Sequence, residues 1–157
     1  MNILDILSPS ALRVPLVNSD KKAVIEELVE LLAEQHLVTD APTLKRVIWE
    51  REQQRSTGIG EGLAIPHGKC ACSAKLVMAI GRPAEPIEFG AIDKRPVRLV
   101  ILLASPPDRT SEHVQALGKI SRLMANVRFR EQAYEAPTAA ALYELFKEAE
   151  ATEPVRR

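Results

Sequence analysis

The sequence is poor in aromatic residues and balanced in charge, and both properties exclude classes of function. Aromatic residues make up 4% of the 157 residues, too few for a surface on which nucleic-acid bases or sugars would stack. Lysine plus arginine and aspartate plus glutamate each number 21, so no net charge attracts nucleic acid or an anionic lipid surface. We therefore expect neither nucleic acid nor a membrane among the partners.

Long apolar runs and a cysteine framework are also missing. The longest apolar run, 97–104, is interrupted by Arg98, whereas a membrane-spanning helix needs about 20 apolar residues. The opening residues show no basic segment followed by an apolar stretch, so we expect no signal peptide. Cys70 and Cys72 lack the second pair that a zinc site needs. We expect both to be ordinary small residues of a cytoplasmic protein in a reducing compartment.

Apolar residues follow two different patterns along the chain, one typical of helices and one typical of strands. Spacing of three and four residues predicts helices at about 21–35, 43–54, 111–127 and 138–149. Short apolar runs bounded by Gly, Pro or Asp predict strands at 63–65, 76–80, 87–89 and 97–104. The expected fold is a single-domain α/β sandwich, with a mixed sheet of about five strands flanked by helices. We expect this domain to span 1–150, followed by a flexible tail at 151–157.

The stretch STGIGEGLAIPHG, 56–68, places one of three histidines in an unusual setting. His67 lies between Pro66 and Gly68 at the end of a short apolar run, where small neighbours give close access to the ring. His113 falls in the first turn of the helix that follows the longest strand. Loops at the ends of neighbouring strands are where α/β proteins gather functional groups. His36, at the end of the first helix, is explained by the negative end of that helix.

A pair of histidines at such a position is suited to phosphoryl transfer. A neutral imidazole can attack phosphorus if its second nitrogen is held as a donor. The phosphoryl oxygens then need cations or hydrogen-bond donors around them. Arg51 or Arg55, at the end of the preceding helix, could supply the cation, and His113 could supply a hydrogen bond. The residue pattern alone leaves open a structural histidine pair as the alternative.

Other chemistries lack their motifs. The glycines of TGIGEG match neither GxxxxGK[ST] nor GxGxxG and follow a predicted helix rather than a strand. Ser56 and Ser111 have no GxSxG context, so an acyl-transfer triad has little support. The chain also contains no HExxH sequence. A hydrolase or metal enzyme is therefore disfavoured.

The run REQQRSTGIGEGLAIPHGK, 51–69, resembles the active-site signature of the mannitol/fructose-type IIA domains of the bacterial phosphoenolpyruvate-dependent phosphotransferase system. The segments 86–106 and 111–124 are similar to the family's central strand and to the region of its second active-site histidine, so the resemblance covers nearly the whole chain. The STGIG form is most similar to the nitrogen-regulatory branch. The positions that match the signature are Glu52, Ile59, Gly60, Leu63, Ala64, Ile65, Pro66, His67 and Gly68.

The resemblance implies a phosphotransferase that acts as a phosphoryl carrier. His67 would be phosphorylated by the phosphohistidine of a small HPr-like phosphocarrier protein. Arg51 would stabilise the phosphoryl group, and His113 would donate a hydrogen bond to it. Family members use no metal or organic cofactor in this step, and their fold is a mixed sheet flanked by helices.

Three functions are compatible with this family resemblance: regulation, sugar transport, and protein interaction without phosphotransfer. A regulatory IIA protein would change its affinity for protein targets when phosphorylated, whereas a transport IIA protein would pass the group to a IIB domain. No IIB or IIC segment is visible, which favours regulation. An interaction module that keeps the fold without phosphotransfer is the third alternative, although a module without the chemistry would be free to lose His67, His113 or Arg51.

Overall fold

The structure is a computed structural model that describes residues 1–152, and its centre is a mixed six-stranded sheet. The strands are β1 (Leu7–Leu16), β2 (Gly58–Gly60), β3 (Leu63–Ala64), β4 (His67–Lys69), β5 (Val77–Pro83) and β6 (Leu99–Ser105). They follow the order β1-β5-β6-β3-β2, and β4 also pairs with β6. β6 runs parallel to β3 and β4 and antiparallel to β5.

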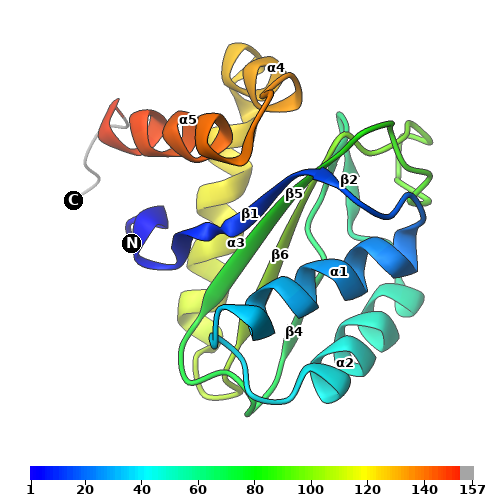
Figure 1. Ribbon diagram of the computed structural model, residues 1–157, viewed down its shortest axis with the longest axis vertical. Coiled ribbons are helices and arrows are strands. Elements are labelled where there is room, and N and C mark those ends of the chain that lie inside the picture. Colours follow the sequence, from blue (N-terminus) through cyan, green and yellow to red (C-terminus); the bar gives the residue numbers. More distant parts are fainter. Residues whose placement is uncertain (153–157) are drawn as a thin grey trace.

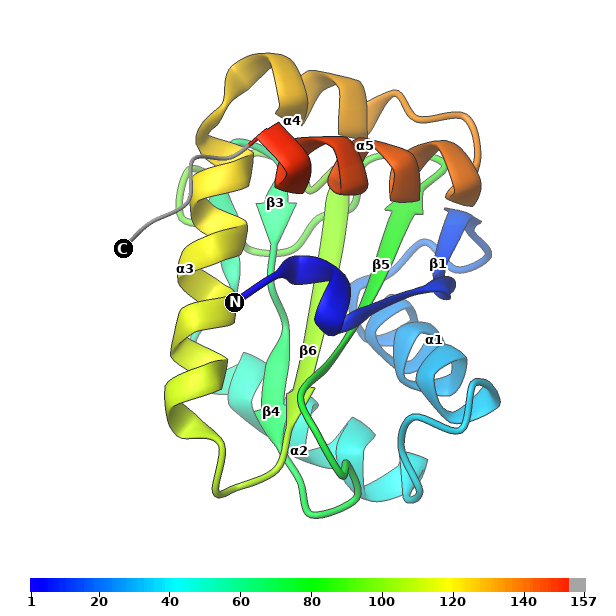
Figure 2. The same ribbon diagram turned by 90° about the vertical axis from the view of Figure 1, so that its left-hand side faces the viewer.

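Helices cover both faces of this sheet (Figures 1 and 2). One face is covered by α1 (Lys21–Glu34) and α2 (Ala41–Gln54), and the other by α3 (Thr110–Ala125), α4 (Val127–Tyr134) and α5 (Ala139–Thr152). A short 3-10 helix, Ile3–Asp5, precedes β1. The predicted single-domain α/β sandwich is therefore confirmed, with six strands instead of about five. Within 1–152, no helix combines the length and apolarity required to span a bilayer.

Side chains of the buried strand β6 alternate between two hydrophobic cores. Ile101 and Leu103 belong to the core under α3, α4 and α5, whereas Val100 and Leu102 belong to the core under α1 and α2. Successive side chains of a strand point to opposite faces. Ser105, two positions after Leu103, therefore lies on the face covered by α3.

The structure differs from the sequence prediction in several elements, among them the three-residue strands β2 and β4, which were not predicted. β1 was not predicted, because Pro9 and Pro15 weaken its strand signal, but it pairs with β5 alone and so has the edge position where proline is tolerated. The short helix α4 was also not predicted. The expected strand at 87–89 is reduced to a single bridge between Ile87 and Val97.

The cysteines and the C-terminal segment also differ from the sequence prediction. Cys70 and Cys72 form a disulfide, contrary to the expectation of two unpaired small residues. A turn closed by the hydrogen bond from Ser73 N to Cys70 O brings their Cα atoms to 5.1 Å, a separation that a disulfide can span. Two residues of the expected tail, Ala151 and Thr152, complete α5. The rest, 153–157, lies outside the described residues.

Candidate functional site

His67 lies where one edge of the sheet is interrupted. β3 and β4 pair with the same strand, β6, one after the other, and the residues between them are Ile65 and Pro66. Proline has no backbone N–H to donate to the ladder, although the Pro66 carbonyl still accepts from Leu103 N at 3.0 Å. Beside this interruption, the Ile65 carbonyl oxygen lies 2.8 Å from Nδ1 of His67. A carbonyl oxygen only accepts hydrogen bonds, so Nδ1 carries the proton and Nε2 of the neutral ring keeps its lone pair.

Gly68 allows α2 to approach the sheet next to this ring. A Cβ atom at this position would come within 2.9 Å of Ile48 Cγ1 and 3.0 Å of Val47 Cγ1, closer than packed carbon atoms allow. Arg51 follows Val47 by one helical turn and is half-buried. Its guanidinium is close enough to influence the titration of His67, and its Nη1 donates to the Arg55 carbonyl at 3.0 Å.

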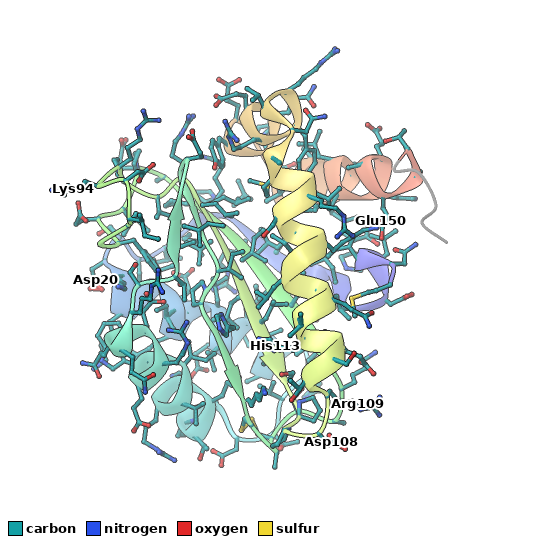
Figure 3. All side chains as sticks on the ribbon, turned by 180° about the vertical axis from the view of Figure 1, so that it is seen from behind. Asp20, Lys94, Asp108, Arg109, His113 and Glu150 are labelled. Atoms are coloured by element: carbon teal, nitrogen blue, oxygen red, sulfur yellow. A yellow bond between two sulfur atoms is a disulfide. The ribbon has the colours of Figure 1, made fainter. Side chains whose placement is uncertain are left out.

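His113 approaches His67 from α3. The two ring centroids are 5.1 Å apart and the ring planes are inclined by 64°. His113 is 5% exposed, and its Nδ1 lies 2.8 Å from the hydroxyl oxygen of Ser105 at the end of β6. Figure 3 shows His113 near the N-terminal end of α3, close to Asp108 and Arg109. In both histidines Nδ1 is engaged by the protein, which leaves Nε2 for other contacts.

Both rings have a lowered pKa, which favours the neutral form. Burial lowers the pKa of His67, and the Arg51 charge lowers it further, although the hydrogen bond to Ile65 and the charge of Glu52 act in the opposite direction. The pKa of His113 is lowered to about 4, first by burial and then by the charges of His67 and Lys69. Neutral imidazole is the form that can act as a nucleophile.

The acidic residue of the signature stabilises the loop that leads to the site. Glu52 is 2% exposed and accepts a hydrogen bond from Thr57 N at 2.7 Å. Lys21 Nζ lies 3.1 Å from the same carboxylate. Thr57 O in turn accepts from Ile65 N at 3.1 Å. Glu52 therefore helps to fix the backbone that carries the partner of His67.

The structure brings the three predicted site residues together and adds two that were not predicted. His67, His113 and Arg51 meet at the ends of three different elements. Ser105 was not singled out, although a polar residue that ends an otherwise apolar strand was an available signal. Lys69 donates to Thr110 Oγ1 at 2.8 Å and so connects β4 with the start of α3. Among 1–152, no group of three or more His, Cys, Asp or Glu could hold a metal ion.

Comparison with known proteins gives relatives of one kind. The family model "Phosphoenolpyruvate-dependent sugar phosphotransferase system, EIIA 2" matches residues 5–149. The nitrogen regulatory protein of Pseudomonas aeruginosa is 34% identical over 140 residues, which cover 89% of this chain and 91% of that protein. The fructose-specific EIIABC component of Bacillus subtilis is 31% identical over 148 residues, which cover 94% of this chain but 23% of that protein.

Solved structures agree with these relatives. The nitrogen regulatory protein IIA-Ntr of Neisseria meningitidis superimposes with a TM-score of 0.84 at 30% identity, covering 92% of this chain and 98% of that chain. The IIA mannitol structure from Escherichia coli gives a TM-score of 0.75 at 21% identity, covering 88% of this chain and 97% of that chain, and shares the fold. Because the family model matches nearly the whole length of the chain, this chain belongs to the EIIA 2 family of the phosphoenolpyruvate-dependent sugar phosphotransferase system.

Proposed function

We propose that the protein is a phosphoryl carrier that accepts a phosphoryl group on Nε2 of His67. The observation that carries this proposal is the hydrogen bond of 2.8 Å between His67 Nδ1 and the Ile65 carbonyl, which leaves the Nε2 lone pair free. In the proposed step this lone pair attacks the phosphorus of a phosphohistidine on an HPr-like phosphocarrier protein. The new N–P bond forms as the old one breaks, and the leaving imidazole takes the bonding electron pair.

Arg51 and His113 are the proposed stabilisers of the transferred group. Phosphoryl transfer depends on positioning and on charge stabilisation of the phosphoryl oxygens. The Arg51 guanidinium offers a fork of N–H donors with a permanent positive charge. His113, with its ring 5.1 Å from that of His67, offers a neutral N–H donor. The proposal needs no metal ion or organic cofactor, since the oxygens are met by side chains of the chain itself.

The proposed role of the phosphoryl group is regulation. It adds a charge of about −1.5 to −2 to the surface around His67, enough to repel one protein partner or recruit another. The 34% identity to the nitrogen regulatory protein of Pseudomonas aeruginosa, over 89% of this chain, supports this role. The regulated partners would be proteins with different affinity for the two states.

A second candidate function is sugar transport, in which the group passes on to a IIB domain. The 31% identity to the fructose-specific EIIABC component, over 94% of this chain, is the observation in its favour. The two roles differ in the acceptor. Rapid loss of the phosphoryl group to a purified fructose-type IIB domain would select transport, whereas retention of the group with a change in partner binding would select regulation.

The experiment that tests the carrier function is an intact-mass measurement. The protein is incubated with phosphoenolpyruvate, enzyme I and an HPr-like carrier. We expect the gain of one acid-labile phosphoryl group in the wild type and in His36→Ala, and no gain in His67→Ala. His36→Ala is the matched control, because it removes an imidazole outside the site. No gain in the wild type, with a carrier that labels another IIA protein, would overturn the proposal.

A further inference from the structure

From the contact between strand β6 and helix α3 we infer that Ser105 is a positioning residue, which fixes the proton of His113 on Nε2. Its hydroxyl oxygen lies 2.8 Å from His113 Nδ1. Geometry alone permits either atom to be the donor, because a hydroxyl both donates and accepts. The surroundings of Ser105 decide between the two directions.

The surroundings of Ser105 favour the hydroxyl as the donor. Ser105 is 0% exposed, so no solvent molecule is at hand to accept its proton. Within 1–152, His113 Nδ1 is the single hydrogen-bond partner of this hydroxyl. If Nδ1 carried the proton and Ser105 accepted it, the hydroxyl proton would be buried without an acceptor, which is costly. With Ser105 as donor, the hydroxyl proton and the Nδ1 lone pair satisfy each other, and the neutral ring must carry its proton on Nε2.

The backbone of Ser105 is also fixed relative to His67. Ser105 is in register with Lys69 in the parallel pairing of β6 and β4, and its carbonyl accepts from Cys70 N at 2.9 Å. His67 and Ser105 therefore belong to the same short ladder. Ser105 thus pairs through its backbone with β4, the strand that carries His67, and contacts the ring of His113 through its side chain.

The two rings consequently have complementary proton arrangements. His67 has its proton on Nδ1 and a lone pair on Nε2, whereas His113 has a lone pair on Nδ1 and its proton on Nε2. A phosphoryl group on His67 would present acceptor oxygens, and His113 would face them with a donor rather than a second lone pair. This inference deepens the proposed function, and its consequence for transfer rests on that function, but the proton arrangement itself does not.

The proton arrangement can be tested in the unphosphorylated protein. Two-bond proton–nitrogen NMR correlations distinguish the two neutral tautomers of each histidine. Near neutral pH we expect His113 to be protonated at Nε2 and His67 at Nδ1. A His113 protonated at Nδ1 would overturn the inference even if the protein is a phosphoryl carrier. This measurement needs no variant, so it does not depend on the folding of one.

Kinetics then test whether Ser105 acts through His113. We expect Ser105→Ala to slow phosphorylation of His67 by about tenfold and to give a mixture of His113 tautomers. Ser105→Thr, which keeps a hydroxyl, should restore the single tautomer. Ser73→Ala is the matched control, because Ser73 is also buried but donates to the Lys75 carbonyl instead.

A double-mutant cycle separates positioning from a general loss of structure. In a His113→Ala background the Ser105→Ala change should slow transfer no further, because the residue through which Ser105 acts is gone. An equal, multiplicative slowing in both backgrounds would overturn the inference. Absence of phosphorylation in the wild type would instead count against the proposed function and leave the tautomer measurement standing.

Discussion

The two histidines lie in regions that hold them by different means. His67 is held by β4 through a main-chain acceptor two residues earlier, the Ile65 carbonyl. His113 is held by α3 through a side chain from another element, Ser105 of β6. A carbonyl partner only accepts, so it allows one tautomer of the histidine. A hydroxyl partner can donate or accept, so it allows two tautomers, and the burial of Ser105 selects between them. His67, the proposed nucleophile, is therefore oriented by the local backbone, whereas His113 is oriented by tertiary packing.

The strongest way to test this comparison is to remove the locally held ring. His67→Ala should abolish phosphorylation, because the Nε2 nucleophile is gone. The ring is only partly buried, so the free energy of unfolding should change by no more than about 1 kcal/mol. Intact mass and thermal unfolding measure the two effects. A variant that no longer folds would mean that His67 has a mainly structural role.

Substitutions of Arg51 test the surroundings of His67. Arg51→Ala should slow phosphorylation by roughly 100-fold, as expected for loss of one oriented donor. Removing its positive charge should also raise the pKa of His67, which that charge lowers. Arg51→Lys should recover the pKa but only part of the rate, since an ammonium cannot reproduce the guanidinium fork. Equal rates for Arg51→Lys and the wild type would contradict the fork argument.

Removing the ring that depends on packing should have a smaller effect on transfer. His113→Ala should slow phosphorylation by about 10-fold to 100-fold and leave the acceptor nitrogen of His67 intact. It also deprives the buried Ser105 hydroxyl of its partner, which should lower the free energy of unfolding by about 1–3 kcal/mol. Rapid-quench kinetics and chemical denaturation measure these changes. An unchanged rate would remove His113 from the proposed mechanism.

The effect expected to change transfer least is a pH dependence of stability due to His113. Its pKa is lowered from 6.5 to about 4 by burial, so below pH 6.5 the unfolded chain binds more protons than the folded protein. The free energy of unfolding should therefore decrease as the pH falls from 6.5 towards 4, and this contribution should be fully retained above 6.5. Denaturation of the wild type and of His113→Gln across this range measures the effect. Identical slopes would show that His113 titrates normally.

Elements of the fold were predictable where the sequence of the element itself carries the pattern of a helix or a strand. The helices α1 and α2 have strong periodic patterns and β6 is apolar throughout, so the sequence predicted them, although α2 begins at Ala41, two residues earlier than expected. β1 contains two prolines, and only its edge position makes them acceptable. Edge position is a property of the whole sheet, which local sequence patterns do not specify.

The site was predictable to a similar extent. His67 lies in one contiguous stretch, and its small neighbours Pro66 and Gly68 indicate from the sequence alone that the ring is accessible. His113 required the expectation that two loops meet at neighbouring strand ends. Ser105 carried no motif, because its proposed role depends on burial and on a ring eight residues later in the chain. Residues that act through another residue leave the weakest trace in a single sequence.

The hydrogen bond between His67 Nδ1 and the Ile65 carbonyl has a consequence for the energetics of the proposed phosphoryl transfer. Because the Ile65 carbonyl holds a proton on Nδ1, attack by Nε2 yields a phosphorylated ring that is an imidazolium cation. When the phosphoryl group moves on, this ring departs as neutral imidazole, a far better leaving group than an imidazolate anion. Loading and unloading then require no proton exchange with water. In the proposed function, this one main-chain contact therefore serves both the acceptance and the release of the phosphoryl group.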